Sequence, residues 1–332
     1  MKKLELGRRI RESWPYKKVR SWAQSNSLPG FEGLPIYSVF DFIRAELKKD
    51  NILIRANAMA FSFFIALFPS ILVLFTLLPY LPIQDLTTTV KESIDQLLPG
   101  EAALYLQDVI DTLTTDENSG LLSFSLFLTL LFASNGMLTM LRGFDKSYEI
   151  TYKSRSTFGQ RLVALKLTFI VGGIFIFSLI AIVAGRIVMD ILLDWTQIDS
   201  ARYYAILITR WFAMFFLFYG GISVAYRYGP AMKNKIKLLS PGAMLATILS
   251  LLSSIAFSYY VSKFGRYNEL YGSLGAIIVL MLWIQINSLI ILIGYELNAS
   301  IKINKDMVEI MSAPIEATTE EEVDQASEPP QR

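Results

Sequence analysis

Seven polar side chains lie within or beside long apolar stretches, where a polar group needs a partner or a function. Glu296 is the carboxylate among them. An ionised carboxylate there requires a cation or backbone donors, and Arg142 is the expected partner. Glu296 is then either a proton or cation site or half of a structural ion pair. The full set of candidate pocket or ion-binding residues is Asn57, Asn135, Arg142, Gln285, Asn287, Glu296 and Asn298.

The amides in this set predict hydrogen bonding inside the membrane. Asn57 begins one apolar stretch and Asn135 lies inside the next, so we expect them to line a common polar pocket. The alternative is structural bonding between helices, which contributes about 0.6 kcal/mol on average. Gln285 and Asn287 are two positions apart, a spacing that points them to different faces of a helix. At most one of the two is expected to face a shared central site.

Three further residues are candidates for bending or close packing. Pro69 lies near the middle of its apolar stretch, where proline removes a backbone donor and kinks a helix. Two explanations fit Pro69 equally well: it acts as a hinge, or it shapes the helix to fit its neighbours. Gly272 and Gly275 favour close helix packing over a gating role.

The composition excludes several chemistries. The chain has no Cys and no His, so a disulfide, a Cys/His zinc site and an imidazole base are excluded. Acid–base chemistry would fall to Asp, Glu, Lys or Tyr. No catalytic residue, metal or cofactor is expected. The net charge of +2 does not by itself indicate nucleic-acid binding, and no nucleic-acid partner is expected.

The same composition indicates an integral membrane protein. Of 332 residues, 53% are hydrophobic and 18% are charged. The apolar residues gather in runs of about 20, the length that crosses a bilayer. We therefore predict an all-α, polytopic bundle of about six transmembrane helices, multi-pass in the membrane. The expected spans are residues 57–80, 121–141, 162–189, 203–226, 241–262 and 272–300.

The remaining segments differ in charge and pattern. Residues 1–36 predict a basic, mostly irregular cytoplasmic tail without a cleavable signal. Residues 37–50 predict an amphipathic helix, either on the inner leaflet or packed on the protein. Residues 82–118 are acidic and predict an amphipathic helical hairpin outside the membrane. The membrane domain is expected over 37–303, followed by an acidic, disordered cytoplasmic tail over 304–332.

Basic residues alternate between the loops and predict the orientation. The segment before the first span is rich in Lys and Arg, and so are the loops after the second and fourth spans. The intervening loops are poor in both. Both termini are therefore expected on the cytoplasmic side.

Two stretches resemble the first and last membrane helices of the YihY/BrkB family. The first contains Asn57, Ala58 and Ala60, then Phe61-Ser62 and Phe68-Pro69. The second opens with Tyr-Gly-Ser-Leu-Gly-Ala from Tyr271 to Ala276. It ends with Gly294, Glu296, Leu297, Asn298 and Ala299. The resemblance covers about residues 37–303.

The resemblance implies a bacterial inner-membrane location more firmly than an activity. Members of the family have carried the labels ribonuclease BN, virulence factor and serum-resistance protein. The proline in the first span, the amides inside the membrane and Glu296 favour a transporter, a channel or a protein that handles lipid or small solutes. The expected partner is the lipid bilayer, and a homo-oligomer is possible. One alternative is an assembly protein acting through the outer hairpin. Ribonuclease activity is disfavoured, because the cytoplasmic loops are short and basic without clustered carboxylates.

Overall fold

The computed structural model describes most of the chain as long helices. The described residues are 14–49, 51–77, 107–108, 110–111, 119–145, 148, 150–194, 199–263 and 273–312. The helices there are α2 (Trp14–Ser25), α3 (Ile36–Lys49), α4 (Ile52–Leu77), α7 (Ser119–Phe144), α8 (Thr157–Asp194), α9 (Asp199–Tyr228), α10 (Pro241–Lys263) and α12 (Ser273–Ser312). This confirms the predicted all-α, polytopic bundle.

Helices long and apolar enough to cross a membrane account for five of the predicted spans in the described part of the chain. They are Ile52–Thr76, Gly120–Phe144, Thr157–Ser178, Pro241–Tyr260 and Ile277–Met311. The predicted span 203–226 falls within α9, a helix of 30 residues. Its role as a sixth span stays a prediction.

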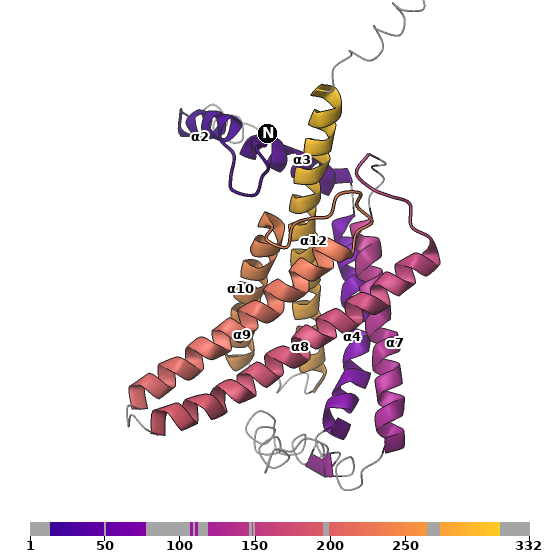
Figure 1. The fold of residues 1–332 in the computed structure, drawn as a ribbon, viewed down its shortest axis with the longest axis vertical. Helices are drawn as coiled ribbons and strands as arrows, with labels where there is room; N and C mark the ends of the chain where they lie inside the picture. Colours follow the sequence, from indigo (N-terminus) through magenta and orange to yellow (C-terminus); the bar gives the residue numbers. More distant parts are fainter. Residues whose placement is uncertain are drawn as a thin grey trace, which may run out of the picture.

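The long helices follow one another around a ring. α4 packs on α7, α7 on α8, α8 on α9, α9 on α10 and α10 on α12, and α12 returns to pack on α4. Figure 1 shows α2 and the end of α12 at one end of the molecule and the short piece at 107–111 at the other. We call the first the terminal end and the second the far end.

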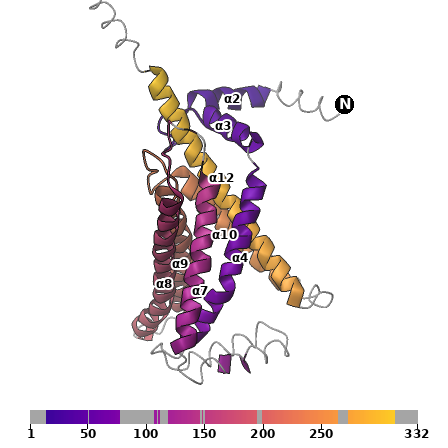
Figure 2. The ribbon, with the colours of Figure 1, turned by 90° about the vertical axis from the view of Figure 1, so that its right-hand side faces the viewer.

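The buried core is concentrated at the terminal end. Its largest cluster includes Met59 from α4, Phe144 from α7, Tyr226 from α9 and Tyr295 from α12. Toward the far end, no residue described in 251–260 of α10 or 277–283 of α12 is buried. Figure 2 shows the beginning of α12 leaning away from α4 and α7 there. The described far halves of α10 and α12 therefore lack the buried contacts of the terminal end.

Two loops also close the terminal end. Tyr152 and Met232 form an antiparallel bridge, with Lys153 N–H donating to the Ala231 carbonyl at 2.7 Å and Lys233 N–H to the Thr151 carbonyl at 2.9 Å. These are the loops after α7 and after α9. Their basic residues therefore lie at the same end as α2 and the end of α12.

Both expected tails contain helix in their described parts. In the N-terminal tail, residues 14–25 form α2, where an irregular segment was expected. The last helix does not end near residue 300 but continues to Ser312. Its extension is helical because Ile303 and Asp306 are buried, and Asp306 accepts a hydrogen bond from the Thr151 hydroxyl at 2.8 Å. The amphipathic helix expected at 37–50 is confirmed as α3.

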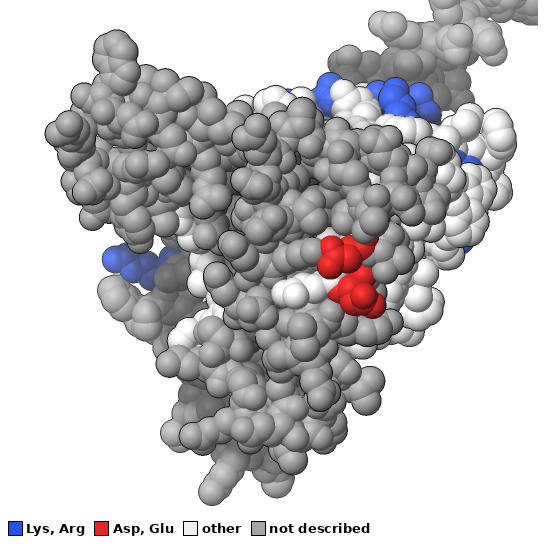
Figure 3. Space-filling view, turned by 90° about the horizontal axis from the view of Figure 1, so that it is seen from below, with Lys and Arg blue, Asp and Glu red and all other residues white. Residues whose placement is uncertain are grey.

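The expected outer hairpin at 82–118 lies largely outside the described residues. Within it, 107–108 and 110–111 are helical, and Ile110 is fully buried. Figure 3 looks onto the far end, where described acidic side chains form a patch among residues drawn in grey. Asp108 and Asp111 are exposed acidic residues of this segment.

Candidate functional site

A buried ion pair joins the first and last long helices. Arg55 Nη2 of α4 lies 2.9 Å from Glu296 Oε1 of α12, and the Glu296 side chain is only 1% exposed. The other guanidinium nitrogen, Nη1, donates to the Gly143 carbonyl of α7 at 2.6 Å. One arginine thus connects three helices. Such a pair satisfies the carboxylate at a depth where an isolated charge is costly.

Arg55 replaces Arg142 as the cation that the structure places beside Glu296. Arg142 lies at the end of α7 and is exposed. Sequence reasoning missed Arg55 because it began the first span at residue 57, whereas α4 begins at Ile52 and carries Arg55 into the bundle.

Two of the expected amides do meet. Gln285 Nε2 of α12 donates to Asn57 Oδ1 of α4 at 2.7 Å, in an exposed bond. Asn287 bonds within its own helix, donating to the Trp283 carbonyl at 2.9 Å. The two neighbours on α12 therefore have separate partners, as their spacing predicts. The Asn57–Gln285 pair lies on the same two helices as the ion pair, about half a turn from Arg55 on α4 and about three turns from Glu296 on α12.

Asn135 belongs to a different contact. Its Oδ1 accepts from Arg161 Nη1 of α8 at 3.1 Å. Between α4 and α7, Ser62 and Thr139 bond instead, at 3.0 Å. The structure therefore does not pair Asn135 with Asn57, because Asn135 turns toward α8 and Asn57 turns toward α12.

Asn298 has a structural partner set at the start of α10. Its Oδ1 accepts from Gly242 N–H at 2.9 Å and its Nδ2 donates to Ser240 Oγ at 3.0 Å. The amide satisfies one of the unbonded N–H groups that every helix start presents. Close to it, Gly242 and Gly294 let α10 and α12 nearly touch, since a Cβ on Gly242 would lie 2.0 Å from the Gly294 carbonyl oxygen.

Four aromatic rings fill the ring of helices beside the ion pair. The Tyr152 and Tyr295 hydroxyls are 2.7 Å apart. Phe144 stacks on Tyr295 with ring centroids 4.2 Å apart, and the Tyr226 hydroxyl donates to the Ile291 carbonyl at 2.5 Å. We call Phe144, Tyr152, Tyr226 and Tyr295 the aromatic plug. Sequence reasoning missed these residues, whose aromatic side chains look like ordinary core residues.

The structure describes two of the three candidates for bending or close packing, Pro69 and Gly275. Pro69 lies inside α4 and is buried, and the adjacent Ser70 hydroxyl donates to the Ala66 carbonyl at 2.7 Å. Gly275 lies in the first turn of α12. Gly272 falls outside the described residues. Their roles in bending or packing stay predictions.

Comparison with known proteins finds one matching family model and several similar proteins. The profile of the family described as virulence factor BrkB matches residues 43–316. A ribonuclease-like protein, YfkH, of Bacillus subtilis (strain 168) is 31% identical over 245 residues, which cover 74% of this chain and 88% of that protein. A UPF0761 membrane protein of Aliivibrio salmonicida is 25% identical over 80% of this chain and 83% of its own.

A third relative extends the same pattern. A UPF0761 membrane protein of Coxiella burnetii (strain Dugway 5J108-111) is 24% identical over 76% of this chain and 89% of its own. No solved structure matches the chain.

Proposed function

This chain belongs to the BrkB virulence-factor family of membrane proteins, and from that premise we propose that it moves a small solute or a lipid across or within the bilayer. The proposed location is the bacterial inner membrane, with both termini in the cytoplasm and the bilayer as its partner. The substrate is identified only by class.

One observation carries this proposal: the buried contacts are concentrated at the terminal end, and the described far halves of α10 and α12 lack them. The aromatic plug and the Arg55–Glu296 pair fill the terminal end. The far halves of α10 and α12 have no buried residue in 251–260 or 277–283. A transporter needs a gate that closes on one side while the other side admits the substrate. The plug and the ion pair have the position of such a gate.

The chemistry of the gate suits opening and closing. Its members come from α4, α7, α9, α12 and the loop after α7, and they are joined by hydrogen bonds, one ion pair and stacked rings. Separating α4 from α12 would break the ion pair and the Asn57–Gln285 bond together. A two-state element of this kind needs two alternative arrangements of its contacts, one for the closed gate and one for the open gate.

The test is transport in liposomes. Purified protein is reconstituted and assayed for flux of a panel of anionic, cationic and neutral solutes and for movement of labelled phospholipid between leaflets. We expect one class to move faster than in empty liposomes and Glu296→Gln to change that rate several-fold. Asp41→Asn, an exposed carboxylate on α3, is the matched control and should leave the rate unchanged.

Absence of movement for every member of the panel, in the unaltered protein and in Glu296→Gln alike, would contradict the proposal. A dry, static bundle would then favour the assembly role instead.

The ribonuclease-like name of the Bacillus subtilis relative supplies a second candidate. We propose that this chain is not an enzyme, because it has neither His nor Cys to act as the base or nucleophile that many nucleases use. Incubating the purified protein with labelled RNA and divalent metal ions tests this. Cleavage that survives repurification would overturn it.

A further inference from the structure

A strained turn before α3 holds one carboxylate in a defined place. Gly30, Glu32 and Gly33 all have positive φ, at 88°, 53° and 86°. Positive φ is uncommon for a residue other than glycine and persists only where surrounding contacts require it. Phe31 anchors the turn, since it is buried in a cluster with Val39 and Leu297 among others.

The contacts that hold Glu32 in this conformation come from lysines of two other elements. The Glu32 carboxylate lies 3.0 Å from Lys305 Nζ and 3.9 Å from Lys302 Nζ, both on α12. It lies 3.9 Å from Lys237 Nζ, in the loop before α10. Partial burial alone would raise the pKa of Glu32, but the hydrogen bond from Lys305 and the charges of all three lysines outweigh it. The pKa of Glu32 is therefore below its ordinary value.

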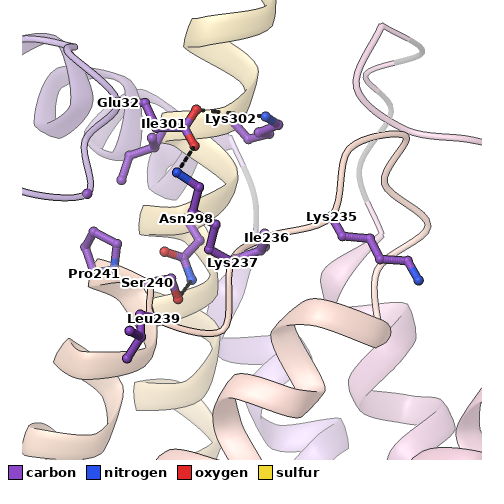
Figure 4. Close-up of a pocket in the computed structure, with 11 residues that line it drawn as sticks. Glu32, Lys235, Ile236, Lys237, Leu239, Ser240, Pro241, Asn298, Ile301 and Lys302 are labelled. Carbon is purple, nitrogen blue, oxygen red and sulfur yellow. Dashed lines mark hydrogen bonds and ion pairs between the residues drawn. The ribbon is translucent and has the colours of Figure 1, made fainter.

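A cavity of about 50 Å³ opens beside this cluster. Its lining includes Glu32, Lys237, Lys302, Ser240 and Asn298. Figure 4 shows Lys237 and Lys302 converging on the Glu32 carboxylate, with Ser240 and Asn298 below them. Lys235 also lines the cavity, but its ammonium group points away and lies over the Tyr228 ring.

Among the described residues, the charges of this cluster do not balance within it. Three ammonium groups surround one carboxylate there, and Lys305 also lies 3.7 Å from Glu309. Lysine ammonium groups bind phosphate as point charges. Exposed leucines adjoin the cluster, with Leu239 77% exposed and Leu238 45% exposed. A basic group beside exposed apolar side chains at the end of membrane helices suits a phospholipid headgroup and its chain.

We propose that Lys237, Lys302 and Lys305 form a binding site for a phosphate-bearing anion, which Glu32 occupies as an intramolecular stand-in. The anion is either the headgroup of an acidic phospholipid or free phosphate. On binding, the phosphate displaces the Glu32 carboxylate and loosens the turn at residues 30–33 from α12. The site uses none of the residues of the proposed gate and stands independently of the proposed function.

Native mass spectrometry of the detergent-solubilised protein tests this site. The protein is incubated with equal amounts of phosphatidylglycerol and phosphatidylcholine, and the retained lipids are counted. We expect phosphatidylglycerol to be retained several-fold over phosphatidylcholine. Glu32→Gln should raise that ratio several-fold, because it removes the competing charge. The double variant Lys302→Gln/Lys305→Gln should abolish the preference.

Two control variants and a second arm of the experiment separate the outcomes. Lys302→Arg/Lys305→Arg keeps the charge and should restore the preference, which distinguishes loss of the site from a folding defect. Lys153→Gln removes an exposed lysine elsewhere and should change nothing. In a second arm, a fluorophore on a cysteine introduced at the exposed Ser27 reports the turn as inorganic phosphate is added, with sulfate-free chloride buffer as reference.

The two arms of the experiment distinguish the two possible sources of the anion. Preference for phosphatidylglycerol identifies the headgroup as the ligand, whereas a response to inorganic phosphate alone identifies the free anion. Lipid ratios and phosphate responses that are the same in the unaltered protein, Glu32→Gln and Lys302→Gln/Lys305→Gln would overturn the proposal.

Discussion

At the scale of single residues, polar groups in the membrane helices are joined across helix pairs rather than gathered in one pocket. Arg55 and Glu296 connect α4 to α12, Asn135 and Arg161 connect α7 to α8, and Asn298 connects α12 to α10. Each polar side chain thereby strengthens a contact between neighbours in the ring. The pair at Glu296 differs from the others because it is charged and its carboxylate is almost wholly buried, so its loss should destabilise the protein most.

Removing one partner of this pair should destabilise the protein strongly. Arg55→Gln takes a cation from a carboxylate that is 1% exposed, and breaking a buried pair in this way costs about 3–5 kcal/mol. Unfolding in mixed micelles at increasing SDS content measures the change. The double variant Arg55→Gln/Glu296→Gln should lose less than the sum of the single variants, because it leaves no buried charge.

Arg142→Gln is the matched control, since Arg142 is an exposed arginine at the end of α7. Equal losses of stability for Arg142→Gln and Arg55→Gln would contradict the assignment of the ion pair.

At the scale of elements, apolar length predicted the helices well and their ends poorly. The span expected at 241–262 is α10, at 241–263, because proline and serine mark its start. The last helix was expected to stop near 300, but it runs to Ser312. Its final turns are polar and are held by contacts such as Thr151–Asp306, which join segments 155 residues apart and leave no local pattern. The Arg55–Glu296 pair joins segments 241 residues apart and leaves no local pattern either, and the expected first span began two residues after Arg55.

The crossing of α10 and α12 should tolerate no side chain at its closest point. Gly242→Ala would place a Cβ 2.0 Å from the Gly294 carbonyl oxygen, and overpacking of this kind costs about 1–3 kcal/mol or more. The expected result is a lower melting temperature and poor recovery from the membrane. Gly173→Ala is the matched control, because nothing lies within 4 Å of that position, and alanine should stabilise the helix by about 0.5–1 kcal/mol.

The turn at Glu32 should loosen in acid. The pKa of Glu32 is below its ordinary 4.5 in the folded protein, because Lys305, Lys302 and Lys237 outweigh its partial burial. A depressed folded pKa stabilises the protein above the ordinary value and loses that contribution as the pH falls through the folded value. A fluorophore at Ser27 should therefore report release of the turn only below about pH 4.5. In Glu32→Gln the signal should not depend on pH in this range.

At the scale of the whole molecule, the ring returns to its starting helix and brings both described ends of the chain together. The terminal end carries α2, the last turns of α12 and the two bridged loops, and the far end carries residues 107–111 (Figure 1). The alternation of basic loops predicts that the terminal end faces the cytoplasm.

Single cysteines test this orientation cleanly, because the chain contains none of its own. A membrane-impermeant maleimide added to intact cells should label Asp111→Cys and not Ser27→Cys, two exposed positions at opposite ends. In inverted vesicles the pattern should reverse. Labelling of both positions from the same side would contradict the arrangement of the helices as membrane spans.

The Arg55–Glu296 pair also has a consequence for biosynthesis, because it can form only after both of its helices have been made. Its partners are separated by 241 residues, which a ribosome adds in about 10–50 s at 5–20 residues per second. Until the last helix is made, Arg55 has no Glu296 carboxylate with which to pair. A nascent chain that stops before α12 therefore carries an arginine in its first long helix without the partner that the finished protein supplies.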